Sequence, residues 1–227
     1  MWGREVNGLV LTFHLAGINN QNFLMRDEET GTWWQQISGK AVSGPLARQS
    51  LRLIPSDELT FSLWKSEQPG GTVLKDVAAY ADQNSPKDWD VAMKKRPTVI
   101  SYAGDGLGDR DLMLGMHAFG ESRAFPRELV LREKLVKDRI GSESVILVVG
   151  PDGESVRAFR PGTNDFYQTS EGMIDSTTGS QWNFQGCAVS GDSKGKCLER
   201  IGIIADYWFD WRQYNPQTTV YRGATRR

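Results

Sequence analysis

Residues 39–44, Gly-Lys-Ala-Val-Ser-Gly, return almost unchanged as Gly-Cys-Ala-Val-Ser-Gly at residues 186–191. A second block lies upstream of each copy. Thr-Gly-Thr-Trp-Trp at residues 30–34 matches Thr-Gly-Ser-Gln-Trp at residues 178–182, with one residue inserted or deleted between the blocks. Repeated stretches of this kind predict that one structural unit occurs twice in the chain.

The similarity extends over residues 29–74 and 177–221. Downstream of the shared blocks the offset stays at 147 residues, since Trp64, Pro69 and Val73 match Trp211, Pro216 and Val220. This period is far too long for a solenoid or a propeller. We therefore expect a duplicated, domain-sized unit: residues 1–75 form the C-terminal part of a first unit, 76–97 a polar linker, and 98–227 a complete second unit.

Composition excludes several classes of partner. The net charge is −1 and the isoelectric point is about 6.2, so no global electrostatic attraction to nucleic acid or an acidic membrane is expected. The longest apolar run, residues 145–149, is far shorter than a membrane helix needs. The first residues lack the apolar segment of a signal peptide, and a strand pattern begins near Val10, which suggests a processed or truncated chain.

The pattern predicts an α+β fold, mainly antiparallel β with short helices. Eight Trp, nine Phe and 24 Gly favour short strands joined by tight turns. Strands are expected within 112–125, 136–140, 144–149 and 156–159, with residues 16–22 as a polar loop. Helices are expected after Ser56 as N-cap, over 127–135, and over 207–214.

The chain resembles the bacterial family called domain of unknown function 3179. The residues that carry the likeness lie at 25–27, 30–36, 39–46, 126–129, 138–141, 145–149 and 207–211. This resemblance implies a repeated β-rich unit, often in exported bacterial proteins, with no established activity. Many members carry Cys-x-x-Cys before the strand that leads into the Trp-rich run, and residues 150–153, Gly-Pro-Asp-Gly, occupy that place here. The fold is therefore expected to transfer, whereas thiol or metal chemistry at that position is not.

Cys187 and Cys197 are the only cysteines. Gly191 and Gly195 lie between them, so a turn can bring the two cysteines within bridging distance. We expect a structural disulfide in an oxidising compartment. Two free buried thiols, or a catalytic or metal-ligating pair, are the alternatives. A nine-residue spacer matches neither a zinc knuckle nor a thioredoxin motif.

Histidines and acidic loops give no case for a cofactor or a metal. His14 and His117 each sit in an apolar strand context, where a half-buried structural role is the ordinary one. Residues 104–111 gather three aspartates in a glycine-rich loop, but the spacing fits no EF-hand, and Arg110 offsets the charge. We expect no metal, no cofactor and no catalytic residue.

A polar ligand is the interpretation favoured for the amide-rich segments beside the tryptophans. The candidate ligand-binding residues are Asn19, Asn20, Asn22, Trp33, Trp34 and Gln35. Amides that cap turns are the alternative. Residues 206–211 could form an aromatic platform for carbohydrate, although helix packing explains the same spacing.

These patterns predict a non-catalytic binding or scaffold module of an exported, extracytoplasmic bacterial protein, with a protein or a small polar ligand as partner. Two other functions remain open. One is an extracytoplasmic thiol-redox or metal-handling protein, and the other is a glycan-binding protein. The sequence does not decide whether the chain is an enzyme.

Overall fold

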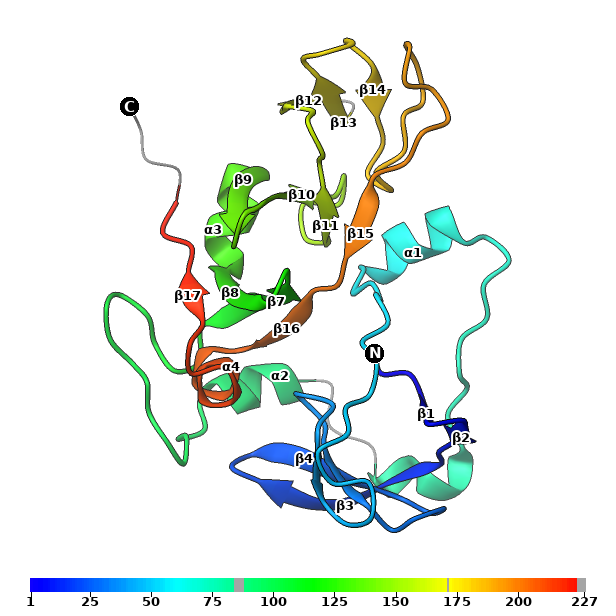
Figure 1. The fold of residues 1–227 in the computed structure, drawn as a ribbon, viewed down its shortest axis with the longest axis vertical. Helices are drawn as coiled ribbons and strands as arrows, with labels where there is room; N and C mark the ends of the chain where they lie inside the picture. The colour runs from blue at the N-terminus through cyan, green and yellow to red at the C-terminus, as the bar shows by residue number, and fades with distance from the viewer. Residues whose placement is uncertain (84–87, 171, 224–227) are drawn as a thin grey trace.

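The computed structural model describes residues 1–83, 88–170 and 172–223. Antiparallel sheets and short helices make up the chain, which confirms the predicted fold class (Figure 1). Within the described residues, only β17 pairs with its neighbour in parallel. No helix in this part of the chain has the length and apolar character that crossing a bilayer requires.

The N-terminal part forms a two-stranded and a four-stranded sheet, the latter in the order β3-β4-β5-β6. The strands are β1 (Glu5–Val6), β2 (Leu9–Val10), β3 (Phe13–Asn19), β4 (Asn22–Asp27), β5 (Trp33–Gln35) and β6 (Ala41–Ser43). The predicted loop at residues 16–22 is wrong. The strands continue to a tight turn at Asn20 and Gln21, whose φ angles of 48° and 68° reverse the chain in two residues.

The second half contains three sheets. Their orders are β16-β7-β8-β17, β15-β11-β10-β9 and β12-β13-β14. The strands are β7 (Leu112–Ala118), β8 (Glu121–Pro126), β9 (Leu135–Ile140), β10 (Glu143–Val149), β11 (Val156–Arg160), β12 (Phe166–Thr169), β13 (Gly172–Asp175), β14 (Gln181–Trp182), β15 (Glu199–Ile201), β16 (Ile204–Tyr207) and β17 (Thr219–Val220). Helix α3 (Arg127–Glu133) contributes Val130 to the main apolar core. The strands predicted between 112 and 159 are confirmed.

The same hydrogen bonds recur in the two halves. Trp34 Nε1 donates to Asp27 Oδ2 at 2.8 Å, and Trp182 Nε1 donates to Asp175 Oδ2 at the same distance. A threonine hydroxyl, from Thr30 or Thr178, also donates to each carboxylate. A buried aspartate thus ties each turn to the tryptophan that fills the core behind it.

Glycines in the shared stretch also occupy equivalent surroundings. A Cβ added at Gly39 would lie 2.7 Å from the Trp2 ring, and one at Gly186 would lie 2.3 Å from the Phe159 ring. Real Cβ atoms do not approach other atoms so closely. The aromatic ring therefore explains why glycine stands at both places.

Helix α1 (Phe61–Glu67) begins later than predicted. Its N-cap is Thr60, whose side chain accepts from the backbone N–H of Leu63, and not Ser56. The chain from 56 to 60 stays extended because its groups are engaged elsewhere: Asp57 pairs with Arg157, and Thr60 N–H donates to Ser155 Oγ. None of the residues of α1 is buried.

Helix α4 (Trp208–Tyr214), unlike α1, is largely buried. Trp208, Phe209, Asp210 and Trp211 are buried in it, which supports packing over an exposed aromatic platform. The predicted linker contains the 3-10 helix η1 (Ala78–Gln83) and helix α2 (Trp89–Lys94), while its residues 84–87 lie outside the described part.

Polar side chains join the N-terminal sheets to the second half. Tyr214 Oη donates to the carbonyl of Asn19 at 3.2 Å, and Asn22 Nδ2 donates to Asp210 Oδ2 at 2.8 Å. Figure 1 shows β3 and β4 below α4, with the N-terminus between these strands and the upper sheets. Any site along this junction draws on both halves of the chain.

Candidate ligand-binding site

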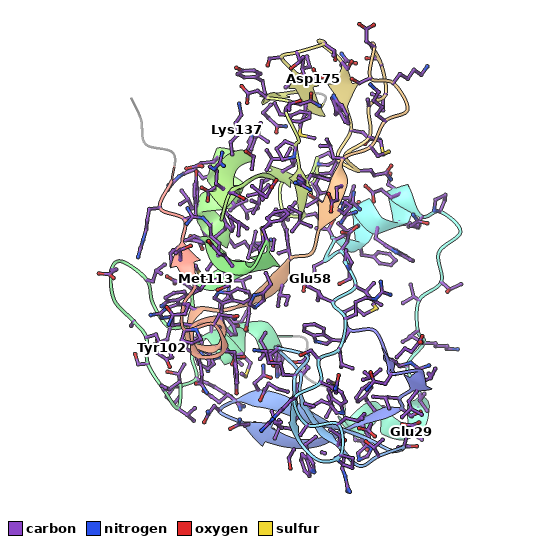
Figure 2. All side chains as sticks on the ribbon, viewed as in Figure 1. Glu29, Glu58, Tyr102, Met113, Lys137 and Asp175 are labelled. Carbon is purple, nitrogen blue, oxygen red and sulfur yellow. A yellow bond between two sulfur atoms is a disulfide. The ribbon has the colours of Figure 1, made fainter. Side chains whose placement is uncertain are left out.

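A cavity of about 240 Å³ lies at the junction between the halves. Its walls come from the N-terminal segment, from the chain around Ser56 and Glu58, and from residues 203–206 leading into and along β16. Figure 2 labels Glu58 near the middle of the molecule, where these segments meet. Met1 lies at the edge, and its amino group donates to Ser56 Oγ at 3.2 Å.

Two acidic side chains face this cavity, Glu58 and Asp206. Burial raises the pKa of Asp206 from its ordinary value of 3.8 to about 8, and the neighbouring charge of Asp210 adds to the effect. Burial also raises the pKa of Glu58, although the amino group of Met1 and Arg127 oppose the shift. Because such shifts concentrate at functional sites, this cavity is the strongest candidate site.

Asp210, whose charge acts on Asp206, is only 5% exposed. Asn22 donates to its Oδ2, and Gln35 Nε2 in turn donates to Asn22 Oδ1. Burial raises the pKa of Asp210, while the Asn22 hydrogen bond and the charge of Arg110 lower it. The guanidinium of Arg110 rests over the ring of Phe209 with its central carbon 4.7 Å from the centroid.

Unpartnered acceptors outnumber unpartnered donors around Asp206 and Asp210. Asp206 Oδ2, Asp210 Oδ1 and Gln35 Oε1 are buried and have no hydrogen-bond partner among the described protein groups, and Arg110 Nη2 is a buried donor that also lacks one. Leaving such oxygens without a donor is costly, more so for a carboxylate than for an amide. Chemically, the arrangement can share protons between its carboxyl groups or accept a cation that brings several N–H donors.

The six predicted ligand residues occupy different environments in the structure. Asn22 and Gln35 are buried; Asn22 donates to Asp210, and Gln35 donates to Asn22. Asn19 and Asn20 are exposed at the β3–β4 turn, and Trp33 is half-buried with Arg26 near its ring. Trp34 is fully buried against Phe13, so its ring is part of the core.

Three acidic residues of the cavity cluster were not predicted from the sequence: Glu58, Asp206 and Asp210. The available signal was the spacing of Asp206 and Asp210, four residues apart among the aromatic residues of the 206–211 segment. A charged side chain at both ends of an apolar stretch is unusual, because charges are rarely buried unless they are paired.

The other predicted polar residues have local partners. His117 packs against Trp211 with 5.2 Å between ring centroids, and burial lowers its pKa, opposed by a hydrogen bond with Asn215. In the 104–111 loop, Asp109 and Asp111 accept from the backbone N–H groups of Tyr102 and Gly108. The described residues contain no group of three or more His, Cys, Asp or Glu that could hold a metal ion.

The family model described as "Protein of unknown function (DUF3179)" matches residues 1–218, nearly the whole chain. The chain belongs to the DUF3179 family. Neither the curated proteins nor the solved structures gave a match. The predicted resemblance is thereby confirmed, and no activity comes with it.

In this DUF3179 chain Cys187 and Cys197 form the predicted disulfide, with 4.0 Å between their Cα atoms. They are also antiparallel bridge partners, as are Lys40 and Ser50 in the first half, the residues that the sequence alignment of the two stretches places opposite them. The backbone geometry that brings the two sulfur atoms together therefore exists in both halves, and only the second half has the thiols to use it. Closing so short a loop stabilises a fold by about 3 kcal/mol.

Proposed function

We propose that this DUF3179 chain is a non-catalytic binding module that takes a small primary amine, as its ammonium ion, into the cavity between its halves. The observation that carries this proposal is Asp206 Oδ2, a buried acceptor in the cavity wall that has no donor. Asp210 Oδ1 and Gln35 Oε1, which are linked to the wall through Asn22, also lack donors. An ammonium group offers three N–H donors for the unpaired oxygens and a positive charge for the carboxylates.

The electrostatics favour the same ligand class. Among the described residues that line the cavity there is no Lys, Arg or His side chain, whereas Glu58 and Asp206 are both present. The amino group of Met1 is the one cationic group among these described residues, and it is engaged by Ser56 Oγ. A cation entering this poorly solvated space interacts with the carboxylates more strongly than it would in water. It also reverses the pKa shift of Asp206, so that binding releases a proton when the pH lies below about 8.

Amine binding should therefore depend on pH. We expect the affinity for n-butylammonium to rise by up to ~10-fold per pH unit below pH 8 and then to level off, because Asp206 must first lose its proton. An alkylamine stays protonated over this range, with a pKa near that of lysine, about 10.4. Isothermal titration at pH 6, 7, 8 and 9, in two buffers of different ionisation enthalpy, gives both the affinity and the protons released.

Matched variants make this experiment specific. Asp206→Asn removes the titrating carboxyl and should abolish both the pH dependence and most of the affinity. Asp192→Asn makes the same change of charge at an exposed position and should behave as wild type. Equal binding by the two variants, or no binding by wild type at pH 9, would contradict the proposal.

An extracytoplasmic location in bacteria is the second part of the proposal. The Cys187–Cys197 disulfide supports it, because such bonds persist mainly in oxidising compartments. Thiol alkylation in intact source cells, followed by mass measurement of the protein, should leave both cysteines unlabelled. Labelling of both cysteines under these conditions would argue for a reducing compartment.

We also infer that the two halves are copies of one unit. The equivalent Asp–Trp hydrogen bonds, the ring-covered glycines and the two bridge pairs support this inference, together with the constant spacing of the sequence blocks. An experimental structure in which residues 29–74 and 177–221 fail to superpose would contradict it.

A further inference from the structure

A second cavity, of about 520 Å³, lies in another part of the fold. Its walls are the last turn of α1, the end of β10 with the following turn, residues 168 and 170, residues 172–173 of β13, and residues 183–185. Figure 1 shows α1 beside β15, with the β12–β14 sheet above them. The volume falls within the range of small-molecule sites.

The described residues of this wall carry little net charge. Glu67 is the only charged residue among the described residues that line it. Its carboxylate is held by Arg157, with Nη1 2.7 Å from Oε1 and Nη2 2.6 Å from Oε2. Arg157 is 4% exposed and also binds Asp57. A cation or an anion would therefore find little favourable electrostatic interaction in this cavity.

Neutral hydrogen-bonding groups surround the cavity instead. Three amides and two hydroxyls line it: Gln168, Asn183, Gln185, Ser66 and Ser170. Each amide offers both donors and an acceptor, and each hydroxyl can act as either. Asn183 is held in place, because its Oδ1 accepts from the backbone N–H of Cys187 at 3.0 Å.

The remaining wall is apolar and fixed. Phe184 packs against Gly150, where an added Cβ would lie 3.1 Å from the ring, and the guanidinium carbon of Arg157 lies 4.4 Å from the ring centroid. Val148 and Met173 are almost fully buried beside it. The cavity thus combines a rigid apolar surface with neutral groups that both donate and accept.

We propose that this cavity binds a neutral saccharide of one or two rings. A sugar presents hydroxyls that donate and accept together with apolar C–H faces, and it carries no charge. Both properties match the walls described above. This site is separate from the amine cavity in place and in chemistry, so either proposal can fail without the other.

To test this, the whole protein is titrated with glucose, N-acetylglucosamine and maltose, and binding is monitored by saturation-transfer NMR observed on the ligand. We expect at least one neutral sugar to bind, and glucosamine and glucuronate to bind at least fivefold more weakly than their neutral parent. Gln185→Ala and Gln168→Ala should each weaken binding at least fivefold. Gln181→Ala, at an exposed glutamine of β14 outside the cavity, should leave it unchanged.

The variants are chosen so that folding does not confuse the result. Gln168, Gln181 and Gln185 are all exposed, and tryptophan near-ultraviolet circular dichroism verifies that each variant keeps its packing. Absence of binding by all three neutral sugars would overturn the proposal. So would binding that Gln181→Ala weakens as much as Gln185→Ala does, or a preference for the charged sugars.

Discussion

Asparagine at position 206 is expected to make the protein increasingly more stable than wild type as the pH rises, by roughly 4 kcal/mol more at pH 9 than at pH 5. The pKa of Asp206 is about 8 in the folded protein and near 3.8 when unfolded. Between these values the folded state binds the proton and the unfolded state does not. The stabilising contribution of Asp206 is therefore fully present below about pH 4 and is lost as the pH rises through 8.

The asparagine variant removes this loss because its side chain stays neutral. Its Oδ1 can still accept from the backbone N–H of Tyr207, which donates to Asp206 at 2.8 Å in wild type. The like-charge repulsion with Asp210 also disappears. Urea unfolding followed by tryptophan fluorescence at pH 5, 7 and 9 measures the effect, with Asp192→Asn as the control. Parallel curves for wild type and Asp206→Asn would show that Asp206 titrates normally.

Alanine at position 175 should cause the largest loss of stability, about 4 kcal/mol. Asp175 is fully buried and accepts from Trp182 Nε1 at 2.8 Å and from the backbone N–H of Thr178 at 2.6 Å. Removing the carboxylate leaves these donors unpaired in the core. Asp27→Ala removes the equivalent interactions behind Trp34 and should have a similar effect.

Guanidinium unfolding at pH 7 measures both losses, and Asp192→Ala, at an exposed position, is the control. Hydrogen bonding to Trp182 and to the Thr178 segment lowers the pKa of Asp175 against the opposing effect of burial. The stabilisation that Asp175 provides is therefore present above about pH 4, its pKa in the unfolded chain, and is lost as the pH falls below that value. The alanine variant should accordingly lose less stability than wild type on acidification. A loss under 1 kcal/mol at pH 7 would mean that the motif is not a major source of stability.

Local patterns predicted the parts of the fold that local interactions determine. The strands between 112 and 159 follow from short alternating segments separated by turns, and the disulfide follows from two cysteines around a turn. The start of α1 could not be predicted in this way. Asp57 looks like a first-turn residue, but its ion pair with Arg157, 100 residues away, keeps the preceding chain extended.

The candidate site depends even more on distant contacts. Asn22 and Gln35 were predicted as ligand residues, yet their role in the site depends on Asp210, which lies 188 residues from Asn22 in sequence. No pattern within one segment reveals that an amide from β4 will meet a carboxylate from α4. The raised pKa of Asp206 likewise arises only after the two halves close over it.

The order β16-β7-β8-β17 has a consequence for synthesis on the ribosome. The β7–β8 hairpin is complete at residue 126, but both of its neighbours come from residues 204–220. The parallel partner of Ala124 is Val220, 96 positions later. During translation, therefore, the edges of this hairpin stay unpaired until residues 204–220 emerge from the ribosome. Open edges invite pairing with other chains, so nascent copies should depend on chaperones or on rapid synthesis of this segment to avoid aggregation.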